Sequence, residues 1–386
     1  MKIVHLCLAC FFPDNYSYQE NLLPKFHKEF GYKVEVLASL MTFDENGKPT
    51  HIKKGCSYIN ENDINVVRLD YKRPIKLYRK LKRYTGTYEA LEKMNPDVLF
   101  IHGCQFMDMD IVIKYLKSHS DVCVFVDSHA DFSNSATNIV SKIFLHKIFW
   151  RHTAKMIEPF ATKFYGVLPA RVDFLKNVYK LPPEKCELLV MGADDDLVEK
   201  SAEPHVRKSI RAEHNISEED FLIVTGGKID LFKKQTLLLM EAVKQMKNPK
   251  VKLLVFGSVV PELKEEVVAL CDGNRIQYIG WIQSKESYDY FAAADLVVFP
   301  GRHSVFWEQV AAQGIPMICK YWDGTTHVDL GGNVKFLYKD SAEEIKYQIE
   351  YLVENQQEYK HMKQIAVERG MKEFSYRDIA KRAIEV

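Results

Sequence analysis

The chain has 386 residues, 47% of them hydrophobic and 27% charged, a globular composition that excludes a disordered chain or a coiled coil. Because hydrophobic cores stop growing at roughly 250–300 residues, two domains are expected. With 53 basic and 52 acidic residues the net charge is +1, so only a local patch could indicate nucleic-acid binding. No stretch approaches the roughly 20 apolar residues that a membrane helix needs.

The N-terminal apolar run, residues 3–12, has two interpretations. It resembles a short signal peptide, but His5 interrupts it and no small-residue cleavage site follows, which favours a buried first strand. Most of the eight cysteines lie in apolar runs, where cysteine behaves as a small hydrophobe. Cys7 and Cys10 have CxxC spacing without a second pair, so a reducing, cytoplasmic location is the simplest interpretation.

Apolar strands alternate with amphipathic helices through the first half of the chain. Strands are predicted at residues 3–12, 33–38, 98–102, 122–127, 164–167 and 187–191. Helices are predicted at residues 22–30, 109–117, 138–152 and 170–179. Apolar strands separated by helices indicate a parallel sheet that is covered on both faces.

A polar stretch, residues 192–220, contains a run of aspartates at 194–196 and is interpreted as the interdomain linker and the entry to the second domain. The alternation then resumes. Strands are predicted at residues 221–225, 251–256, 276–279, 296–299, 316–319 and 334–337. Helices are predicted at residues 234–247, 262–271, 284–293, 305–313 and from 342 onward. The predicted fold is α/β, with two doubly wound Rossmann-like domains facing across a cleft, where the strand ends bind ligands.

Two stretches of the second half could carry chemistry. Residues 226–234, GGKIDLFKK, follow a strand and open a helix, where glycines admit a ligand and Lys228 and Lys233 could neutralise a diphosphate. The alternative is a solvated basic helix start. Residues 299–316 end a strand in a Pro-Gly turn, after which Ser304 could cap the next helix. Glu308 in that helix could accept hydrogen bonds from ribose hydroxyls, or could simply favour the helix dipole.

Together these stretches resemble the donor half of GT-B glycosyltransferases, specifically the retaining family 4. Five ordered elements carry the resemblance: Gly227-Lys228 with Lys233, Phe256-Gly257-Ser258, Gly280-Trp281, Ala294-Asp295, and the segment from Glu308 to Pro316. The resemblance implies an N-terminal acceptor-side domain, residues 1–195, and a nucleotide-sugar donor domain, residues 196–372. It also implies that the final helix, residues 373–386, packs back on the first domain.

By this resemblance, Lys228 and Lys233 hold the donor diphosphate and assist catalysis, and Glu308 binds the ribose. The family's usual first glutamate of this loop is absent, because position 300 is Pro. Its sugar contacts would pass to other groups of the loop. The implied donor-binding residues are Gly227, Lys228, Lys233, Gly257, Ser258, Trp281, His303, Ser304, Val305 and Glu308.

In the first domain, His129 follows a strand and matches the family's histidine beside the reacting sugar, although a lone strand-end histidine is more often structural. The loop after the first strand lacks the family's glycines. Its polar side chains are expected to contact the phosphate or the acceptor; they are Asn15, Tyr16, Ser17 and Tyr18.

Two further motifs have competing interpretations. Asp108-Met109-Asp110 has the DxD spacing of metal-dependent glycosyltransferases, but aspartates also favour a helix start, and no metal or other cofactor is expected. The basic run at residues 72–83 has Leu77 and Leu81 interleaved at helical spacing. It is either a solvated helix face or a contact for anionic lipid headgroups, while nucleic acid is not expected as a partner.

The sequence thus predicts a glycosyltransferase that moves a sugar from a nucleotide-sugar, with UDP favoured, to a glycan or lipid-linked acceptor with retention, in polysaccharide or glycolipid synthesis. The expected location is cytoplasmic, with peripheral contact at the inner face of the membrane. The alternatives are a nucleotide-sugar 2-epimerase of the same fold and a non-catalytic module that binds nucleotide-sugar or glycan.

Overall fold

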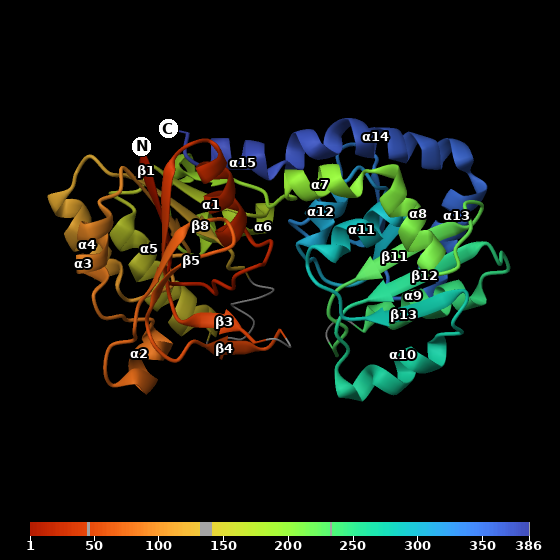
Figure 1. Ribbon diagram of the computed structural model, residues 1–386, viewed down its shortest axis with the longest axis horizontal. Coiled ribbons are helices and arrows are strands. Elements are labelled where there is room, and N and C mark those ends of the chain that lie inside the picture. The colour runs from red at the N-terminus through yellow and green to blue at the C-terminus, as the bar shows by residue number, and fades with distance from the viewer. Residues whose placement is uncertain (45–46, 132–140, 232–233, 386) are drawn as a thin grey trace. The chain divides into compact units, whose positions relative to one another are not determined.

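The computed structural model describes residues 1–44, 47–131, 141–231 and 234–385 (Figure 1). The chain divides into two compact units. Unit 1 comprises Met1–Val190 together with Arg377–Val386, and unit 2 comprises Met191–Tyr376. Unit 2 is therefore inserted in the sequence of unit 1. Among the described residues, no helix is long and apolar enough to cross a lipid bilayer.

An eight-stranded sheet in the order β10-β9-β8-β7-β1-β2-β6-β5 forms the centre of unit 1. All neighbours are parallel except β5 and β6. The strands are β1 (Lys2–Cys7), β2 (Lys33–Ala38), β5 (Ser57–Ile59), β6 (Asn65–Arg68), β7 (Val98–His102), β8 (Cys123–Ser128), β9 (Lys163–Gly166) and β10 (Cys186–Leu188). A separate antiparallel hairpin pairs β3 (Met41–Phe43) with β4 (Pro49–His51).

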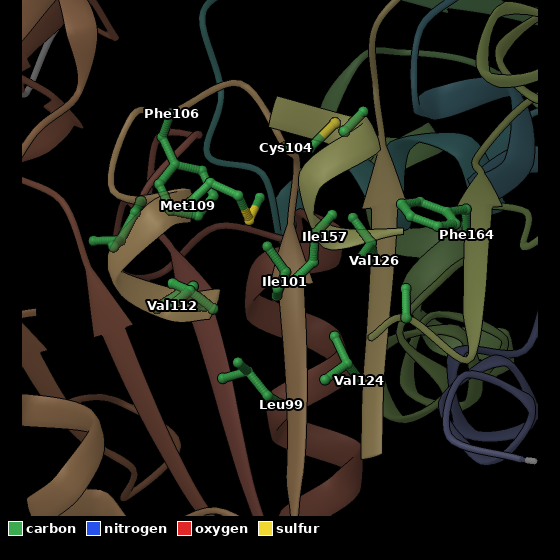
Figure 2. Packing of buried hydrophobic residues seen from close by; sticks show 14 of the residues in the cluster. Leu99, Ile101, Cys104, Phe106, Met109, Val112, Val124, Val126, Ile157 and Phe164 are labelled. Carbon is green, nitrogen blue, oxygen red and sulfur yellow. The ribbon is translucent and has the colours of Figure 1, made fainter. Parts of the chain in front are cut away.

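The helices of unit 1 are α1 (Gln19–Glu29), α2 (Ile75–Leu81), α3 (Thr87–Met94), α4 (Met109–Ser118), α5 (Arg151–Ile157), α6 (Pro169–Asn177) and most of α15 (Tyr376–Arg382), with a π-helical segment at Ser141–Trp150. Alternate residues of each strand face opposite sides of the sheet. Leu99 and Ile101 of β7 pack with Met109 and Val112 of α4 in an apolar cluster (Figure 2). The intervening Phe100 and His102 therefore face the other side.

Unit 2 has a six-stranded parallel sheet in the order β13-β12-β11-β14-β15-β16. Numbered along the unit, this is the 3-2-1-4-5-6 order of dinucleotide-binding folds, and its winding reverses between the first and fourth strands, β11 and β14. The strands are β11 (Phe221–Gly226), β12 (Val251–Phe256), β13 (Ile276–Gly280), β14 (Leu296–Phe299), β15 (Met317–Lys320) and β16 (Val334–Leu337). The predicted α/β fold with two doubly wound units is confirmed.

The helices of unit 2 are α7 (Asp195–Ser201), α8 (Pro204–Glu213), α9 (Gln235–Gln245), α10 (Lys264–Leu270), α11 (Glu286–Ala293), α12 (Phe306–Ala312), α13 (Ala342–Glu354) and α14 (Gln356–Phe374). Residues 192–220 lie at the start of unit 2 and hold α7 and α8, so the linker part of the prediction is wrong. Asp194 caps α7 by accepting from Asp196 N. The buried Arg211 fixes α8 by donating to Ala293 O and Ser217 O.

Candidate functional site

Three strand ends that carry glycine meet at one edge of the unit 2 sheet. Gly227 N donates to Phe256 O at 3.1 Å, and Gly257 N donates to Gly280 O at 2.7 Å. The φ angles of Gly227 and Gly257 are 122° and 126°, in the region that favours glycine. A Cβ on Gly257 would lie only 1.9 Å from Gly227 O, whereas a Cβ on Gly227 would meet nothing within 4 Å. The backbone at Gly227 is therefore open to close approach by a ligand.

Lys228 follows this open glycine directly. Its side chain is 61% exposed, and its Nζ lies 3.4 Å from Asp230 Oδ2. An exposed ion pair of this kind is weak, so the ammonium can exchange its partner for an anion at little cost. Lys233, the second lysine predicted to hold a diphosphate, lies outside the described residues.

The two other predicted contacts on this side lie beside the same strand ends. Ser258 follows Gly257 and is exposed. Trp281 follows Gly280, and its ring is 57% exposed, which is unusual for so large an apolar side chain. Sequence neighbours of the packed glycines thus offer a hydroxyl and an aromatic face at the same edge of the sheet.

The loop between β14 and α12 and the first turns of α12 carry the remaining predicted residues. His303 Nε2 donates to Glu308 Oε1 at 2.8 Å, and His327 Nε2 donates to the same oxygen at 2.8 Å. Glu308 is fully buried, and its Oε2 has no hydrogen-bond partner among the residues that the structure describes. Sequence reasoning missed His327, which lies 19 positions after Glu308 in a loop without a recognisable motif.

The two histidines determine the charge state of Glu308. Burial on its own would raise the pKa of this carboxyl group, but His303 and His327 hold the pKa well below its ordinary value. Glu308 is therefore a buried carboxylate whose Oε1 accepts two hydrogen bonds, one from each histidine. Its other oxygen is available to a hydroxyl donor that could reach it.

Ser304 and Val305 form the turn that opens α12. The predicted side-chain cap by Ser304 is wrong, because Val305 occupies the cap position and no side-chain cap hydrogen bond forms. Ser304 instead accepts from Trp307 N through its backbone oxygen at 3.0 Å. The rings of Phe256 and Phe306 lie 5.8 Å apart, so this turn contacts the glycine-containing strand ends. Both predicted groups of unit 2 therefore flank the β11–β14 reversal point, where such sheets bind ligands.

His303, Glu308 and His327 are also the cluster best suited to hold a metal ion in the described part of the chain, with three ligand atoms within 4.8 Å of one another. Zinc with bonds of about 2.1 Å in tetrahedral geometry would separate neighbouring ligand atoms by roughly 3.4 Å. Both nitrogen–oxygen distances are 2.8 Å, the length of charge-assisted hydrogen bonds. The arrangement fits a hydrogen-bonded carboxylate better than a metal site.

In unit 1, His129 lies just beyond the end of β8 beside two carboxylates. Its Nε2 is 3.7 Å from Asp127 Oδ2 and 3.9 Å from Glu20 Oε1, and the side chain is 33% exposed. Asp127 is fully buried and also accepts from Gln19 Nε2 at 3.1 Å. Burial would raise the pKa of Asp127, but His102 and His129 keep the pKa below its ordinary value. A charged, buried aspartate thus stands behind a partly exposed histidine.

The predicted loop at Asn15–Tyr18 lies against the β3 hairpin. The ring of Phe43 stacks on Tyr16 at 5.6 Å, and the rings of Tyr16 and Tyr18 lie 5.3 Å apart. Asn15 N donates to Glu61 Oε1 at 2.7 Å, whereas Ser17 precedes the Tyr18 cap position of α1. The loop therefore presents partly exposed aromatic faces rather than a glycine-rich backbone.

The DxD motif has a structural role. Asp108 accepts from Tyr84 N at 3.1 Å and from Thr87 Oγ1 at 2.5 Å, and Arg83 donates to Asp110 at 2.6 Å. The prediction that this motif begins a helix is confirmed by α4. Both carboxylates are hydrogen-bonded to other protein groups and do not converge on a position that a metal ion could occupy.

The basic run divides into two parts. α2 has no buried residue, and its Leu77 is 50% exposed among basic side chains. The lysine and arginine that follow α2 are engaged instead: Lys82 Nζ donates to Ala9 O, and Arg83 donates to Asp110. The exposed basic surface of the run therefore comprises Lys72, Arg73 and the basic residues of α2.

Comparison with known proteins gives the fold of the chain and a family match in its second half. The chain has a TM-score of 0.70 with Anabaena HepE bound to UDP, at 14% identity over 99% of this chain and 98% of that one. Sucrose-phosphate synthase from Thermosynechococcus elongatus gives 0.70 at 15% identity, over 99% and 96%. A Listeria monocytogenes protein assigned as a UDP-N-acetylglucosamine 2-epimerase gives 0.64 at 13%, over 99% and 94%. No curated protein sequence matches the chain.

Residues 206–369 match the family Glycosyl transferases group 1. This segment contains the glycine-carrying strand ends, Lys228, and the hydrogen-bonded group of His303, Glu308 and His327. The expected resemblance to GT-B glycosyltransferases is therefore confirmed at the level of the fold, and the segment that matches the group 1 family lies within this GT-B fold.

Proposed function

We propose that the protein transfers a sugar from a nucleoside-diphosphate sugar, with UDP as the favoured nucleotide, to a glycan or lipid-linked acceptor with retention of anomeric configuration. The observation that carries this proposal is the placement of an open glycine turn with Lys228 at the strand end next to the buried Glu308 group. These two features flank the reversal point of the unit 2 sheet.

The proposed role of Lys228 is electrostatic. A leaving diphosphate gains negative charge as the bond to the sugar breaks, and an ammonium group placed beside it stabilises that charge. Lys228 reaches the diphosphate by giving up its exposed pair with Asp230. We assign the same role to Lys233 from the sequence pattern alone.

Glu308 is the proposed ribose ligand. Its unpartnered Oε2 would accept a hydroxyl hydrogen bond, while His303 and His327 hold the other oxygen. Because Oε2 is buried, the side chains that cover it must move for the ribose to reach it. Ser258, Trp281, Ser304 and Val305 are proposed to contact the donor around this group.

Unit 1 supplies the proposed acceptor-side residues. His129 orients the sugar or its nucleophile, with Asp127 behind it. The aromatic faces of Tyr16, Tyr18 and Phe43 suit the apolar C–H face of a pyranose. We propose that the reaction needs no metal, because Asp108 and Asp110 are engaged within the fold; unchanged activity in EDTA would agree.

A 2-epimerase is the second candidate, since one structure of the same fold is assigned that activity. It would convert the nucleotide-sugar without an acceptor. A module that only binds nucleotide-sugar or glycan would turn over nothing.

Incubation with radiolabelled UDP-sugars, with and without a membrane lipid extract or oligosaccharides, separates these functions. Label transferred to an acceptor, with the donor's anomeric configuration retained by NMR, is the expected result. His129→Ala should then lower kcat while leaving UDP affinity unchanged. An altered sugar nucleotide formed without acceptor would establish the epimerase, and binding without turnover would overturn both enzymatic assignments.

A further inference from the structure

A row of buried hydrogen-bonded side chains crosses unit 1 behind His129. His102 Nδ1 lies 2.7 Å from Asp127 Oδ2, and His102 Nε2 lies 3.0 Å from His5 Nδ1. His5 Nε2 lies 3.0 Å from His27 Nδ1, and His27 Nε2 donates to Ala380 O at 2.7 Å. The row therefore runs from β8 through β7, β1 and α1 to the C-terminal helix α15.

Every member of this row is removed from water. Asp127, His5 and His27 are fully buried, and His102 is 1% exposed. Their placement follows from the sheet, since β8, β7 and β1 are neighbours and His102 is paired with Asp127 in the strand register. Buried polar groups must satisfy one another, because no solvent can replace a missing partner.

The protons in this row can be counted. Both ends are acceptors: the Ala380 carbonyl at one and the Asp127 carboxylate at the other. Four hydrogen bonds join the ends through three imidazole rings, and each bond needs one proton. A neutral imidazole carries one N–H and can donate only once. Three neutral rings supply three protons, so the row needs one more.

We propose that His5, His27, His102 and Asp127 form one array, the histidine array, which holds one proton beyond those of three neutral imidazoles and thereby keeps Asp127 ionised as a positioning residue for His129. No bond other than N–H and hydrogen bonds forms or breaks, and the array as a whole is neutral. The role assigned to His129 rests on the proposed function, whereas the proton count does not.

The extra proton belongs at the Asp127 end of the array. Burial disfavours a charged imidazolium, yet the carboxylate of Asp127 raises the pKa of His102 to about 9. Burial lowers the pKa of His27 to about 4, and burial with its two histidine neighbours lowers the pKa of His5. The array is therefore an imidazolium–carboxylate pair extended by two neutral rings whose tautomers are fixed by Ala380.

Groups from each neighbouring element act on this pair. They are Cys7 of β1, Gln19 and Glu20 of α1, and His129 after β8, while the ring of Tyr32 contacts His27 at the other end of the array. Glu20 is the second carboxylate near the pair and favours the extra proton on His102. Through this proton, Asp127 presents a fixed negative charge to His129 without becoming protonated itself.

NMR spectroscopy of the wild-type protein labelled with ¹⁵N in histidine tests the proton count directly. At pH 7, His102 should carry protons on both ring nitrogens, while His5 and His27 should be neutral with the proton on Nε2. Each signal is assigned by its loss in a single-site histidine variant. A neutral His102 at pH 7, or an Nδ1–H tautomer at His5 or His27, would overturn the array.

Enzyme kinetics test the positioning role. In His102→Asn the amide nitrogen replaces Nδ1 and still donates to Asp127, but the charge and the link to His5 are lost. The expected result is a kcat reduced by up to roughly 100-fold, the cost of about 1 Å of misplacement, with unchanged UDP affinity. We also expect wild-type kcat to decline near pH 9, where His102 loses its extra proton, and this decline should be absent in His102→Asn. His152→Gln, which removes an exposed histidine, is the control.

The NMR outcome is independent of the proposed function, whereas the kinetic outcome rests on it. A wild-type-like kcat and pH profile in folded His102→Asn would overturn positioning of His129. The NMR measurement needs no variant to be active. If the protein shows the expected protonation but no transferase activity, the proposed function fails and the proton count stands. If His102 is neutral in an active transferase, the proton count fails and the proposed function stands.

Discussion

At the scale of single residues, the buried carboxylate of Glu308 should make the stability of unit 2 depend on acid pH. The folded-state pKa is depressed below the ordinary value of 4.5, so the contribution is complete above pH 4.5 and is lost as the pH falls below it. Glu308→Gln keeps the shape and removes the charge. We expect it to cost about 3 kcal/mol at pH 7, because a buried carboxylate that accepts two hydrogen bonds is lost.

Urea unfolding of wild type and Glu308→Gln between pH 7 and pH 3 measures this difference. It should shrink as the pH falls below 4.5. A difference that stays constant across the range would mean that the carboxylate charge contributes nothing to folding.

Gly257 should tolerate no side chain. A Cβ there would lie 1.9 Å from a backbone oxygen at a φ of 126°, so Gly257→Ala must displace the glycine turn. We expect a loss of roughly 3 kcal/mol, since both the contact and the backbone strain of about 1–3 kcal/mol are involved, and weaker UDP binding by calorimetry.

Gly273→Ala is the matched control for Gly257. Gly273 also has a positive φ, 74°, but a Cβ there meets nothing within 4 Å. It should cost only about 1 kcal/mol, the usual penalty for a non-glycine residue in this region. Equal losses for the two variants would show that the close contact to Gly227 does not matter.

The sequence predicted which residues of the donor side belong together, but not how they interact. The pairing of Glu308 with His303 follows from nearby positions, five apart on one turn and helix. His327 could not be predicted, because its loop carries no periodic pattern and its partner is set by tertiary packing. The histidine array was missed for the same reason: only the strand order brings His5, His27 and His102 together.

At the scale of secondary-structure elements, α2 should account for any binding to anionic membranes. All its residues are at least partly exposed, and Leu77 lies among Lys76, Arg79 and Lys80. Replacing these three with glutamine should reduce binding to vesicles that contain phosphatidylserine, because each basic residue near such a surface contributes about 1 kcal/mol. Co-sedimentation at low and high salt measures the effect.

A matched variant replaces three exposed lysines elsewhere with glutamine: Lys244, Lys247 and Lys264. The net charge change is the same, so this variant should bind vesicles like wild type. If both triple variants lose binding equally, overall charge rather than α2 is responsible, and α2 is an ordinary solvated helix.

Strands with a mainly apolar run were predictable, and strands or helices without one were not. The predicted bounds of β2, β7, β12, β14 and β16 agree with the structure, because each of these strands is mainly apolar. The strands β3 to β5 show no such run. Helix α8 could not be predicted, because only Val206 and Arg211 are buried along it and its sequence shows almost no apolar face.

At the scale of the whole molecule, the two compact units should respond separately to nucleotide. Trp150 belongs to unit 1, whereas Trp281, Trp307 and Trp322 belong to unit 2, so tryptophan fluorescence of Trp150→Phe reports on unit 2 alone. UDP at about 100 times its Kd should raise the free energy of unfolding of unit 2 by about 2.7 kcal/mol.

The complementary reporter retains Trp150 and replaces the three tryptophans of unit 2 with phenylalanine. The unfolding transition of unit 1, reported by Trp150 fluorescence in this variant, should be unchanged by UDP if the nucleotide binds unit 2 only. An equal shift in both reporters would mean that the two units unfold as one cooperative body, or that unit 1 also binds the nucleotide.

The insertion of unit 2 within unit 1 also separates the order of synthesis from the order of assembly. Ala380, which terminates the row of imidazoles, leaves the ribosome only after all 186 residues of unit 2 (376 − 190) have been made. At about 5–20 residues per second this takes roughly 10–40 s. During translation His27 therefore cannot donate its hydrogen bond to Ala380 O until unit 2 has been synthesised. Unit 1, whose synthesis begins first, is the last unit to acquire all of its residues.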